Sequence, residues 1–587
     1  MDMQTRMSRP HSPSSCHKTP RYAVTSRHAL TRRHALTRWF TIVLISVVTT
    51  SLCSMSASQA AADDAQTVIQ NGQKLEKDRL WGDALNLYQK GLREHPGNAK
   101  LKQRRAIARI HFDLDRRYSD TSFIRTIRET DGNSALNVYA EVLLKVQSYY
   151  VDEPDWAELA SYGLTSVEVG MMAPEFRKVN LPGVTSDQVR SAILKVRKQL
   201  ESTTVESRHD AYMVAATTAQ TLNQTLNLST QGTVYEFVCG AISALDPYSA
   251  FMSSNQYSET MSQIEGNFVG LGVELRTHAD HLEIVSVIPG GSASIGGIIA
   301  GDKITSVDRQ SVAEIGSERA ADLMRGVAGT FIQLVVDRNQ STQTVNLERR
   351  RVEIPSVDQV GIVDAESGVG YIRLTNFQKT TARDFDGALW KLHRQGMRSL
   401  IVDVRGNPGG LLSASVEVAD RFVENGVIVS TKGRNPMEDY THRANVSSTW
   451  RVPLVVLVDE NSASASEIFA AAIRDHHRGT IVGHRSYGKG SVQGIFPLNV
   501  SGGGVRLTTA RFYSPTGKAI SEVGVNADVL VHQTAHAGTN ANDSEDAGMR
   551  VGIKTARLAA EKRATTQRQA ATTTRQPSFE RPAIAGR

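Results

Sequence analysis

Cysteine is scarce in this chain. Only three cysteines occur among 587 residues, and two of them, Cys16 and Cys53, lie in the first 53 positions. Removal of that segment would leave Cys239 alone, so a processed chain could form no internal disulfide. Cys239 lies in an apolar helical run, where we expect a buried small hydrophobic residue rather than a nucleophile. No His/Cys cluster has the spacing of metal ligands, so we expect neither a metal nor another cofactor.

A long apolar stretch is also missing near the N-terminus, where the run WFTIVLISVVTTSLC covers only residues 39–53. A membrane-spanning helix needs about 20 residues. Basic residues precede this run up to Arg38, and small residues follow it, with Ser58 and Ala60 at the positions that a signal peptidase prefers. We therefore predict an export signal over 1–60, with an uncleaved membrane anchor as the alternative.

Net positive charge is confined to the two ends of the chain. The formal net charge is +7, and residues 1–60 and 547–587 each carry +7, so the body between them carries −7. No basic stripe with interleaved aromatic residues runs through that body, which argues against a nucleic-acid partner. From residue 534 the composition is rich in Ala, Thr, Arg and Gln, with few large apolar residues. We therefore predict a disordered basic tail over 534–587.

The rest of the chain divides into regions of different periodicity. Residues 61–133 are predicted to be helical, and a stretch within them, DRLWGDALNLYQKGLREHPGN, resembles one tetratricopeptide-like hairpin. An ordinary amphipathic helix pair is the alternative. Residues 134–265 also show mainly helical spacing, with a polar segment at 172–232 that we interpret as an insertion. Residues 266–352 alternate apolar and polar residues between glycine turns, which predicts a compact, mainly-β module.

Residues 353–533 follow a β-α-β pattern. Two of the predicted strands, in SLIVDVRG and PLVVLVDE, are continuously apolar, which is typical of a sheet covered on both faces. Sites in such folds lie where strands end and helices begin. One such junction is the turn RGNPGGLL at 405–412, and the other is the helix start NSASASEIFAAAIRDH at 461–476. Bare amides in a glycine turn and at a helix N-terminus could together stabilise an oxyanion.

The helix start contains three candidate nucleophiles: Ser462, Ser464 and Ser466. Ser464-x-x-Glu467 also fits a capping box, which is a purely structural motif. A catalytic serine needs a base, and Lys489 in SYGKGSVQ can serve if burial lowers its pKa. Gln493 lies four residues later on a predicted strand, so it would point to the same side and could orient the lysine. Spacing alone leaves the choice among the three serines open.

The chain resembles the carboxy-terminal processing peptidases, tail-specific serine proteases of the S41 type, in two stretches: SASASEIFAAAIRD and SYGKGSVQ. Further blocks of that family are matched in the same order by SALDPYSAFM, FVGLGVEL, RGNPGGLL and LTTARFYSPTGKAI, over residues 134–532. The module 266–352 resembles a PDZ domain. The resemblance implies an α/β fold with a ClpP/crotonase-like layered protease core, an inserted mainly-β PDZ domain and a helical N-terminal region.

The same resemblance assigns roles to individual residues. It implies Ser464 as nucleophile, Lys489 as general base and Gln493 as the residue that orients the base. The oxyanion hole would be formed by two backbone amides, those of Gly410 and Ala465. The amide of the neighbouring Gly409 is a further candidate. Two residues match supporting polar positions, Glu467 as a helix cap and Asp475 at the helix end. The PDZ carboxylate-binding loop would be Gly270, Leu271, Gly272 and Val273.

These assignments imply an exported serine endopeptidase in the bacterial periplasm or on the periplasmic side of the inner membrane. It would bind C-terminal tails through the PDZ domain and cleave them by a Ser-Lys dyad through an acyl-enzyme. Its partners would be proteins or peptides with apolar C-termini, an adaptor on the tetratricopeptide-like region, and the membrane if residues 39–53 stay attached. The alternative is a non-catalytic PDZ scaffold with a protease-like core. A crotonase-like acyl-CoA enzyme fits poorly with an export signal.

Overall fold

The computed structural model describes residues 55–326, 328–445, 449–531 and 546–573. The chain forms two units, 1–60 and 61–587, and the account below concerns the second. Most of the predicted export signal, including its apolar run, lies outside the described residues. Among the helices that are described, none is both long and apolar enough to cross a lipid bilayer.

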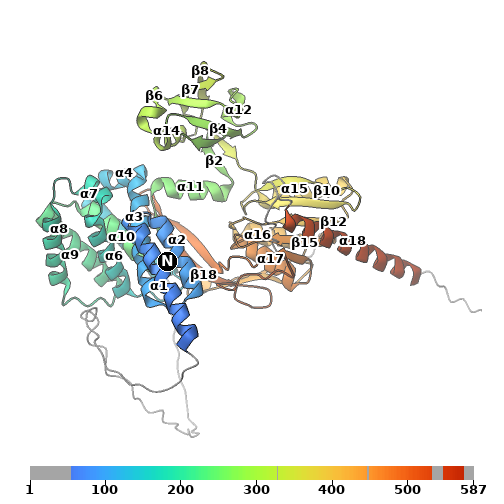
Figure 1. Cartoon of the computed structure of the whole chain (residues 1–587), viewed down its shortest axis with the longest axis horizontal. Helices are drawn as coiled ribbons and strands as arrows, with labels where there is room; N and C mark the ends of the chain where they lie inside the picture. Colours follow the sequence, from blue (N-terminus) through green and yellow to red (C-terminus); the bar gives the residue numbers. More distant parts are fainter. Residues whose placement is uncertain (1–54, 327, 446–448, 532–545, 574–587) are drawn as a thin grey trace, which may run out of the picture. The chain divides into compact units, whose positions relative to one another are not determined.

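Helices make up the first part of the described chain (Figure 1). They are α1 (Met55–Lys77), α2 (Trp81–Glu94), α3 (Ala99–Ser119), α4 (Thr121–Glu129), α5 (Gly132–Tyr149), α6 (Trp156–Met172), α7 (Pro174–Asn180), α8 (Ser186–Leu200), α9 (Arg208–Leu226) and α10 (Thr230–Ser243). Many of them begin at a residue whose side chain accepts a hydrogen bond from the first turn, as Asp120, Asp155 and Ser229 do.

The helical region contains two hydrophobic cores. A small one, around Tyr88 and Leu101, is formed by α1, α2 and α3, and its tetratricopeptide-like character stays a prediction. A large one is formed by α3 to α10, around Tyr139, Phe176 and Phe237. The segment 172–232 holds α7, α8 and α9, and these helices share the large core with their neighbours.

A β-rich module follows helix α11 (Ser254–Glu265). Its strands are β2 (Asn267–Gly270), β3 (Val273–Thr277), β4 (Leu282–Val287), β5 (Lys303–Val307), β6 (Gln310–Ser311), β7 (Phe331–Arg338), β8 (Ser341–Glu348) and β9 (Arg350–Glu353). Its helices are α12 (Ser292–Ile295), α13 (Val312–Ile315) and α14 (Ser317–Met324). Strands pair in the order β3-β4-β5-β7-β8, with β6 beside β5, while β2 pairs with β9. Within the described chain, β3 therefore has one neighbour in its sheet and leaves an edge open.

The two predicted junctions, which hold Gly410 and Ser464, follow strands of a six-stranded sheet with the order β10-β11-β12-β15-β16-β19. Its strands are β10 (Val357–Asp364), β11 (Val369–Leu374), β12 (Ser399–Asp403), β15 (Leu454–Val458), β16 (Thr480–Gly483) and β19 (Val529–Leu530). All pairs are parallel except β10 with β11. On one face lie α15 (Thr381–Arg394), α16 (Leu412–Asp420) and α17 (Ala465–Asp475).

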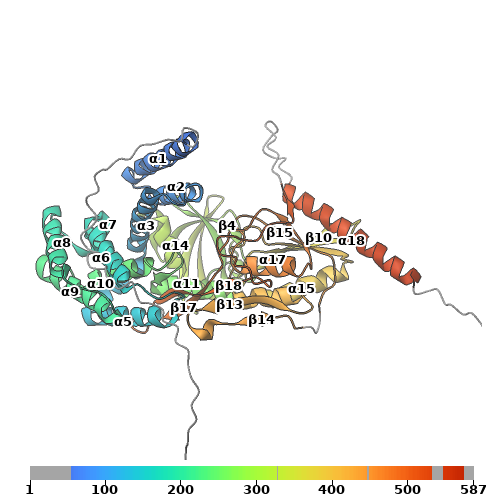
Figure 2. The same cartoon turned by 90° about the horizontal axis from the view of Figure 1, so that it is seen from below.

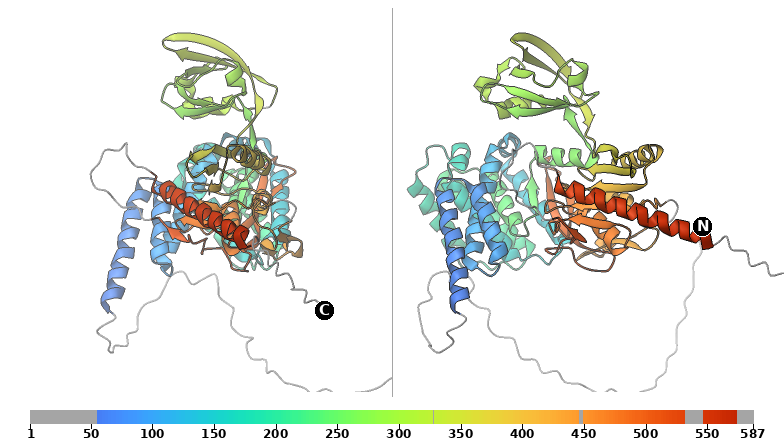
Figure 3. Two further views of the ribbon diagram at one scale, coloured as in Figure 1. Left: turned by 90° about the vertical axis from the view of Figure 1, so that its right-hand side faces the viewer. Right: turned by 45° about the vertical axis from the view of Figure 1, so that its right-hand side comes forward.

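The other face of this sheet is covered by α18 (Ala547–Thr573), the red helix in Figure 3. Residues of the central strands alternate between the two layers: Val402 and Val456 pack with α15 to α17, whereas Ile401 and Val455 pack with α18. A strand with both faces buried must be continuously apolar. The predicted α/β fold class, with a helical N-terminal region and an inserted β-rich module, is confirmed.

A second, antiparallel sheet connects the helical region with the core (Figure 2). Its strands are β1 (Ala250–Met252), β13 (Val427–Gly433), β14 (Thr441–Arg443), β17 (Ser491–Pro497) and β18 (Gly504–Tyr513), and a short 3-10 helix, η1 (Pro436–Glu438), lies between β13 and β14. The order is β1-β18-β13-β14, and β17 also pairs with β18. Pairing of Ala250 with Arg506 brings the block SALDPYSAFM beside β18, the second strand after the predicted base.

The prediction of disorder over 534–587 is wrong for residues 547–573, which form α18. Alanine and other good helix formers dominate this segment. A few apolar residues, among them Met549, Ile553 and Ala556, suffice to cover one face of the sheet. Composition alone missed this helix because its apolar residues are few, whereas the sheet supplies the remaining buried surface. Residues 532–545 and 574–587 lie outside the described part of the chain.

Candidate active site

Ser464 lies at the junction between β15 and α17 and has an unusual backbone. Its φ of 55° and ψ of −113° fall in a region that residues with a side chain rarely adopt. Such strain is concentrated at functional sites, where surrounding contacts hold it. Ser462 and Ser466 are fully buried, and their hydroxyls donate to the carbonyl oxygens of Val404 and Asn407 at 2.8 and 3.0 Å. Ser464 is only partly buried, so exposure separates the three candidates.

The glycine turn after β12 lies directly against this junction. A Cβ atom added to Gly409 would lie 2.8 Å from Cβ of Ser464 and 2.9 Å from the backbone nitrogen of Ala465. A Cβ atom added to Gly410 would lie 2.0 Å from the carbonyl oxygen of Phe377. The φ angles of Gly409 and Gly410, 108° and 135°, also favour glycine. Side chains are thus excluded where the turn approaches Ser464.

The amides around Ser464 differ in their availability. The N–H of Gly409 donates to Oδ1 of Asn407 at 2.8 Å, so it is already engaged. Within the described part of the chain, the N–H groups of Gly410 and Ala465 have no hydrogen-bond acceptor. Ala465 begins α17, where the first N–H groups of a helix lack an internal partner. These two amides can therefore donate to a developing negative charge.

Asn407 fastens the two junctions together, and the sequence did not single it out. Its buried side chain donates from Nδ2 to the carbonyl oxygen of Leu374 at 2.9 Å. Its own carbonyl oxygen accepts hydrogen bonds from the N–H of Ala463 and the hydroxyl of Ser466, both at 3.0 Å. These bonds hold the residues on each side of Ser464. Their partners are mostly backbone groups, which carry no sequence signal.

Glu467 is fully buried one turn after Ser464. Oε1 accepts hydrogen bonds from the hydroxyl of Ser486 and the N–H of Gly488, both at 2.6 Å. Oε2 accepts from the N–H groups of Ser464 and Lys489, at 2.8 and 2.9 Å. Burial raises the pKa of Glu467 above its ordinary value, while these hydrogen bonds act in the opposite direction. The carboxylate caps the helix and also holds the loop that carries Lys489.

Lys489 is confined by residues from three other parts of the chain. Its Nζ lies 4.9 Å from the ring centre of Tyr248, whose carbonyl oxygen accepts a 2.8 Å hydrogen bond from Nε of Arg506. Burial lowers the pKa of Lys489 to about 8, and the positive charge of Arg506 adds to this effect. The charges of Asp246 and Glu467 act in the opposite direction. Tyr248 and Arg506 were not singled out from the sequence.

The side chains of Gln493 and Asp475 are hydrogen-bonded to residues other than Ser464 and Lys489. Gln493, on β17, donates from Nε2 to the hydroxyl of Ser491 at 2.9 Å, and no hydrogen bond joins it to Lys489 within the described chain. Asp475 lies at the C-terminal end of α17, where its Oδ2 accepts from the hydroxyls of Ser514 and Thr516 at 2.6 and 2.8 Å. Asp475 therefore fastens the far end of the helix.

One cavity of about 570 Å³ brings the predicted catalytic groups together. Its walls include Ser464, Lys489, Gln493, Gly410, Ala465 and Arg506. Across the described ranges, no group of three or more His, Cys, Asp or Glu side chains is placed to hold a metal ion. The arrangement offers a serine with a strained backbone, a lysine of lowered pKa and two amides without an acceptor in the described chain, which suits acyl transfer.

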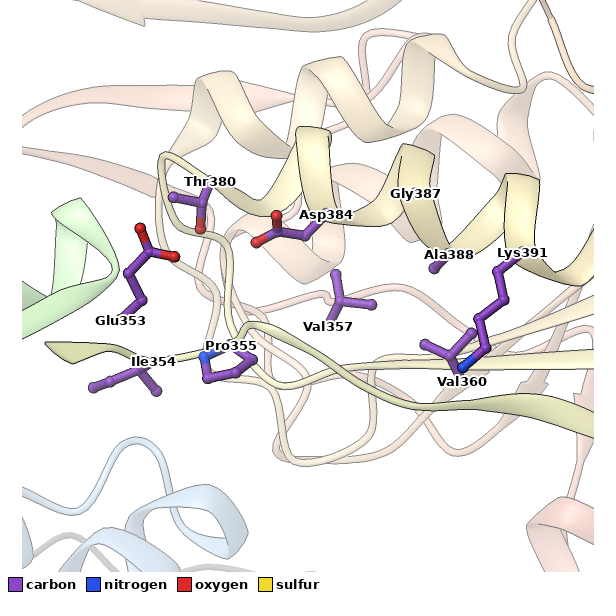
Figure 4. A pocket seen from close by; sticks show the side chains of 10 residues that line it. All are labelled: Glu353, Ile354, Pro355, Val357, Val360, Thr380, Asp384, Gly387, Ala388 and Lys391. Atoms are coloured by element: carbon purple, nitrogen blue, oxygen red, sulfur yellow. The ribbon is translucent and has the colours of Figure 1, made fainter. Parts of the chain in front are cut away.

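A second cavity, of about 400 Å³, lies between β10 and α15 (Figure 4). Its polar lining includes Glu353, Asp384 and Lys391. It contains none of the predicted site residues and no serine or cysteine. We assign no chemistry to it.

In the β-rich module, the predicted carboxylate-binding loop connects β2 with β3. Gly272 has a φ of 80°, which glycine adopts without strain. The carbonyl oxygens of Leu271 and Gly272 accept hydrogen bonds from the N–H groups of Ala293 and Ile288, at 2.8 and 2.9 Å. The loop therefore directs these carbonyl groups towards α12 and the segment after β4.

Known protein families match this chain over the core and over the β-rich module. Peptidase family S41 matches residues 368–531, and the PDZ domain family matches residues 260–337. The chain is 36% identical to the carboxy-terminal-processing protease of Bartonella bacilliformis over 299 residues. This aligned region covers 50% of this chain and 68% of that protein. The chain is 33% identical over 312 residues to the carboxyl-terminal-processing protease of Picosynechococcus sp., covering 52% of this chain and 75% of that protein.

The chain belongs to the carboxy-terminal-processing proteases of peptidase family S41. It is a serine-type peptidase with a PDZ domain. Among solved structures it resembles a photosystem II D1 C-terminal processing protease, with 28% identity and a TM-score of 0.34, over 59% of this chain and 93% of that one. The S41 match ends at residue 531, before helix α18 begins.

Proposed function

We propose that this S41 protease cleaves protein tails with a Ser464–Lys489 dyad, through an acyl-enzyme. The observation that carries this proposal is the shared cavity. Ser464, Lys489, Gly410 and Ala465 all line it, and the amides of the last two have no acceptor among the described residues. A nucleophile, a base of suitable pKa and an oxyanion site are the parts that acyl transfer needs.

In the proposed reaction, neutral Lys489 accepts the proton of the Ser464 hydroxyl as the serine oxygen attacks the scissile carbonyl. The amides of Gly410 and Ala465 donate to the oxyanion of the tetrahedral intermediate. Protonated Lys489 then gives its proton to the leaving amine, and the acyl-enzyme forms. A water molecule then attacks the acyl-enzyme while Lys489 takes its proton, and Lys489 returns this proton to the Ser464 oxygen as the acid product leaves. With a pKa of about 8, roughly a tenth of Lys489 is neutral at pH 7.

Gln493 is proposed to orient Lys489 during this cycle. In the present conformation its Nε2 is bound to the hydroxyl of Ser491, while its side chain lines the same cavity as Lys489. Rotation away from Ser491 would turn its carbonyl oxygen towards the lysine as an acceptor. Asp475 is proposed to act only through the position of α17, because its partners lie at Ser514 and Thr516.

Substrate capture is proposed to occur at the PDZ domain. The loop Gly270, Leu271, Gly272 and Val273 would present N–H groups to a C-terminal carboxylate, and the tail would pair with the open edge of β3. An apolar tail suits such a site, because alternate side chains of an added strand enter pockets. We propose further that the chain is exported to the bacterial periplasm by the segment 1–60.

The test uses the full chain and an unfolded protein with an apolar C-terminus. Ser464→Ala and Lys489→Ala are compared with Ser462→Ala, a serine two residues away that is buried. We expect losses of at least about 10³-fold in kcat for the first two variants, because they remove parts of one catalytic unit. Ser462→Ala should stay within about tenfold of the unmodified chain. Thermal unfolding of each variant confirms that it is folded.

Equal cleavage by Ser464→Ala and the unmodified chain would reject the dyad. A second candidate function, a non-catalytic PDZ scaffold, is favoured only if the folded, unmodified chain binds the tail peptide and cleaves nothing. In that case binding should depend on a free C-terminal carboxylate, and a C-terminally amidated peptide serves as the matched control.

A further inference from the structure

The start of helix α18 is bound to the catalytic core through one carboxylate. Asp546 precedes the helix, and its Oδ1 accepts a hydrogen bond from the N–H of Met549 at 3.0 Å, as an N-cap does. Both oxygens also accept from the Nη groups of Arg405, at 2.8 and 2.7 Å. The pKa of Asp546 lies below its ordinary value, chiefly because Arg405 donates these hydrogen bonds. The same group therefore caps α18 and holds Arg405.

Arg405 is the first residue of the glycine turn that ends at Gly410. Its Nη2 also donates to Oδ2 of Asp403 at 2.6 Å, and its backbone N–H donates to Oδ1 of Asp403 at 3.0 Å. Asp403 belongs to β12 and is almost fully buried, so this contact is part of the core. Asp546 comes from outside the S41 match and holds the same guanidinium from the other side. The root of the turn is thus fixed between the core and the C-terminal helix.

Two glycines let α18 come close to the core. A Cβ atom on Gly548 would lie 2.8 Å from Nη1 of Arg405, and one on Gly552 would lie 3.0 Å from Cδ2 of Leu457 on β15. A further contact of α18 is an ion pair between Arg557 and Asp364, at the end of β10. Of these two charged contacts of the helix, the one at Asp546 touches the turn and the one at Arg557 does not.

We propose that α18 supports catalysis by holding the glycine turn in place, and that Asp546 is the positioning residue for the amide of Gly410 in the oxyanion hole. This inference rests on the proposed function of Gly410. Asp546 touches no reacting atom and acts through Arg405 and the turn between Arg405 and Gly410. Docking of α18 and the competence of the oxyanion hole are then coupled, so a chain with the helix displaced would bind substrate and turn it over slowly.

The expected effect is on kcat rather than on KM. The amide of Gly410 donates to charge that develops in the transition state, so its misplacement weakens transition-state stabilisation without changing ground-state binding. A shift of about 1 Å in such a group can lower the rate about 10²-fold. Arg405 is held by Asp403 and by Asp546. Loss of the Asp546 contact leaves the Asp403 contact in place, so we expect kcat to decrease about tenfold.

The experiment measures kcat and KM of the full chain for Asp546→Ala, Asp546→Asn and Asp546→Glu. Arg557→Ala is the matched control, because it removes a charged contact of the same helix that does not touch the turn. Ser464→Ala is included to report on the proposed function. We expect kcat to fall about tenfold in Asp546→Ala with KM within twofold, an intermediate fall in Asp546→Asn, and recovery of most of the activity in Asp546→Glu. Arg557→Ala should keep its kcat.

Each outcome distinguishes the two claims. If Ser464→Ala is inactive while Asp546→Ala keeps the kcat of the unmodified chain, the role of Asp546 is rejected and the dyad stands. Equal losses of kcat in Arg557→Ala and Asp546→Ala would also reject it, because a general loosening of the helix would then explain both. Full activity of Ser464→Ala would overturn both claims. If Asp546→Ala fails to fold, comparison of Asp546→Asn with Arg557→Ala decides.

Discussion

The backbone N–H groups of Ser464 and Lys489 are bound to the same oxygen atom, Oε2 of Glu467, at 2.8 and 2.9 Å. The two proposed catalytic residues are 25 positions apart in the sequence, yet one buried carboxylate sets the distance between their backbones. A change in this carboxylate should therefore disturb the base and the nucleophile together.

Glu467→Gln tests this relationship. An amide has one acceptor oxygen and one donor NH₂, so it cannot accept from all four donors that surround Glu467. The unsatisfied N–H groups cost about 1–3 kcal/mol each, and we expect kcat to fall at least about tenfold. Asp475→Asn is the matched control at the other end of α17, and its kcat should change by less than threefold. Similar losses in both variants would show that only the stability of α17 matters.

The pH dependence of kcat/KM should report the state of Lys489. Its pKa of about 8 lies below the ordinary lysine value, and the base must be neutral to act. Activity should therefore fall about tenfold per pH unit below pH 8 and level off above it. An activity that is unchanged between pH 6 and pH 9 would exclude a lysine base.

Arg506 provides a second test on the acidic limb of the pH profile, where activity falls below pH 8. Its positive charge contributes to the lowered pKa of Lys489, whereas Asp246 and Glu467 oppose it. Arg506→Gln removes a like charge, so the pKa of Lys489 should rise and the acidic limb should move to higher pH. Arg506→Lys keeps the charge and should leave the limb in place. A shift in the opposite direction would show that the hydrogen bond to Tyr248, and not the charge, is what matters.

Gly410 allows a test of the oxyanion turn. In Gly410→Ala the new Cβ would lie 2.0 Å from the carbonyl oxygen of Phe377, so the turn must move. Loss of one oxyanion donor typically lowers kcat about 10²–10³-fold. Gly396→Ala is the control, because Gly396 also has a positive φ, 85°, and open space around it. It should lose about 1–2 kcal/mol of stability and keep its kcat.

The fold could be predicted from the sequence because its determinants are local. Continuous apolar strands such as β12 and β15 indicate a sheet buried on both faces, and both faces are covered. Helix α18 was missed since its sequence is poor in large apolar residues. The sheet face that it covers is assembled from strands spread between Val369 and Val531, so the composition of 547–573 does not reveal it.

The site was predictable only in part. Spacing located the two junctions and left three serines open; the family resemblance selected Ser464, and in the structure Ser464 is also less buried than Ser462 and Ser466. The bonds of Glu467 to Gly488 and Lys489 involve backbone N–H groups, which every residue except proline carries. Contacts of this kind leave no pattern in the sequence and appear only when the loops are placed in space.

Tyr248 is expected to confine the side chain of Lys489. Its ring centre lies 4.9 Å from Nζ, and the ring face attracts the protonated lysine while its bulk excludes water. These two effects shift the pKa in opposite directions, so the informative quantity is kcat on the alkaline plateau, where the lysine is neutral. Tyr248→Leu removes the ring and should lower that plateau about tenfold, whereas Tyr248→Phe keeps the ring and should stay within threefold. Tyr513→Leu is the control, because Tyr513 also packs against a lysine, Lys432, with the ring centre 5.9 Å from Nζ. A plateau lowered equally by Tyr248→Phe would assign the effect to the hydroxyl instead of the ring.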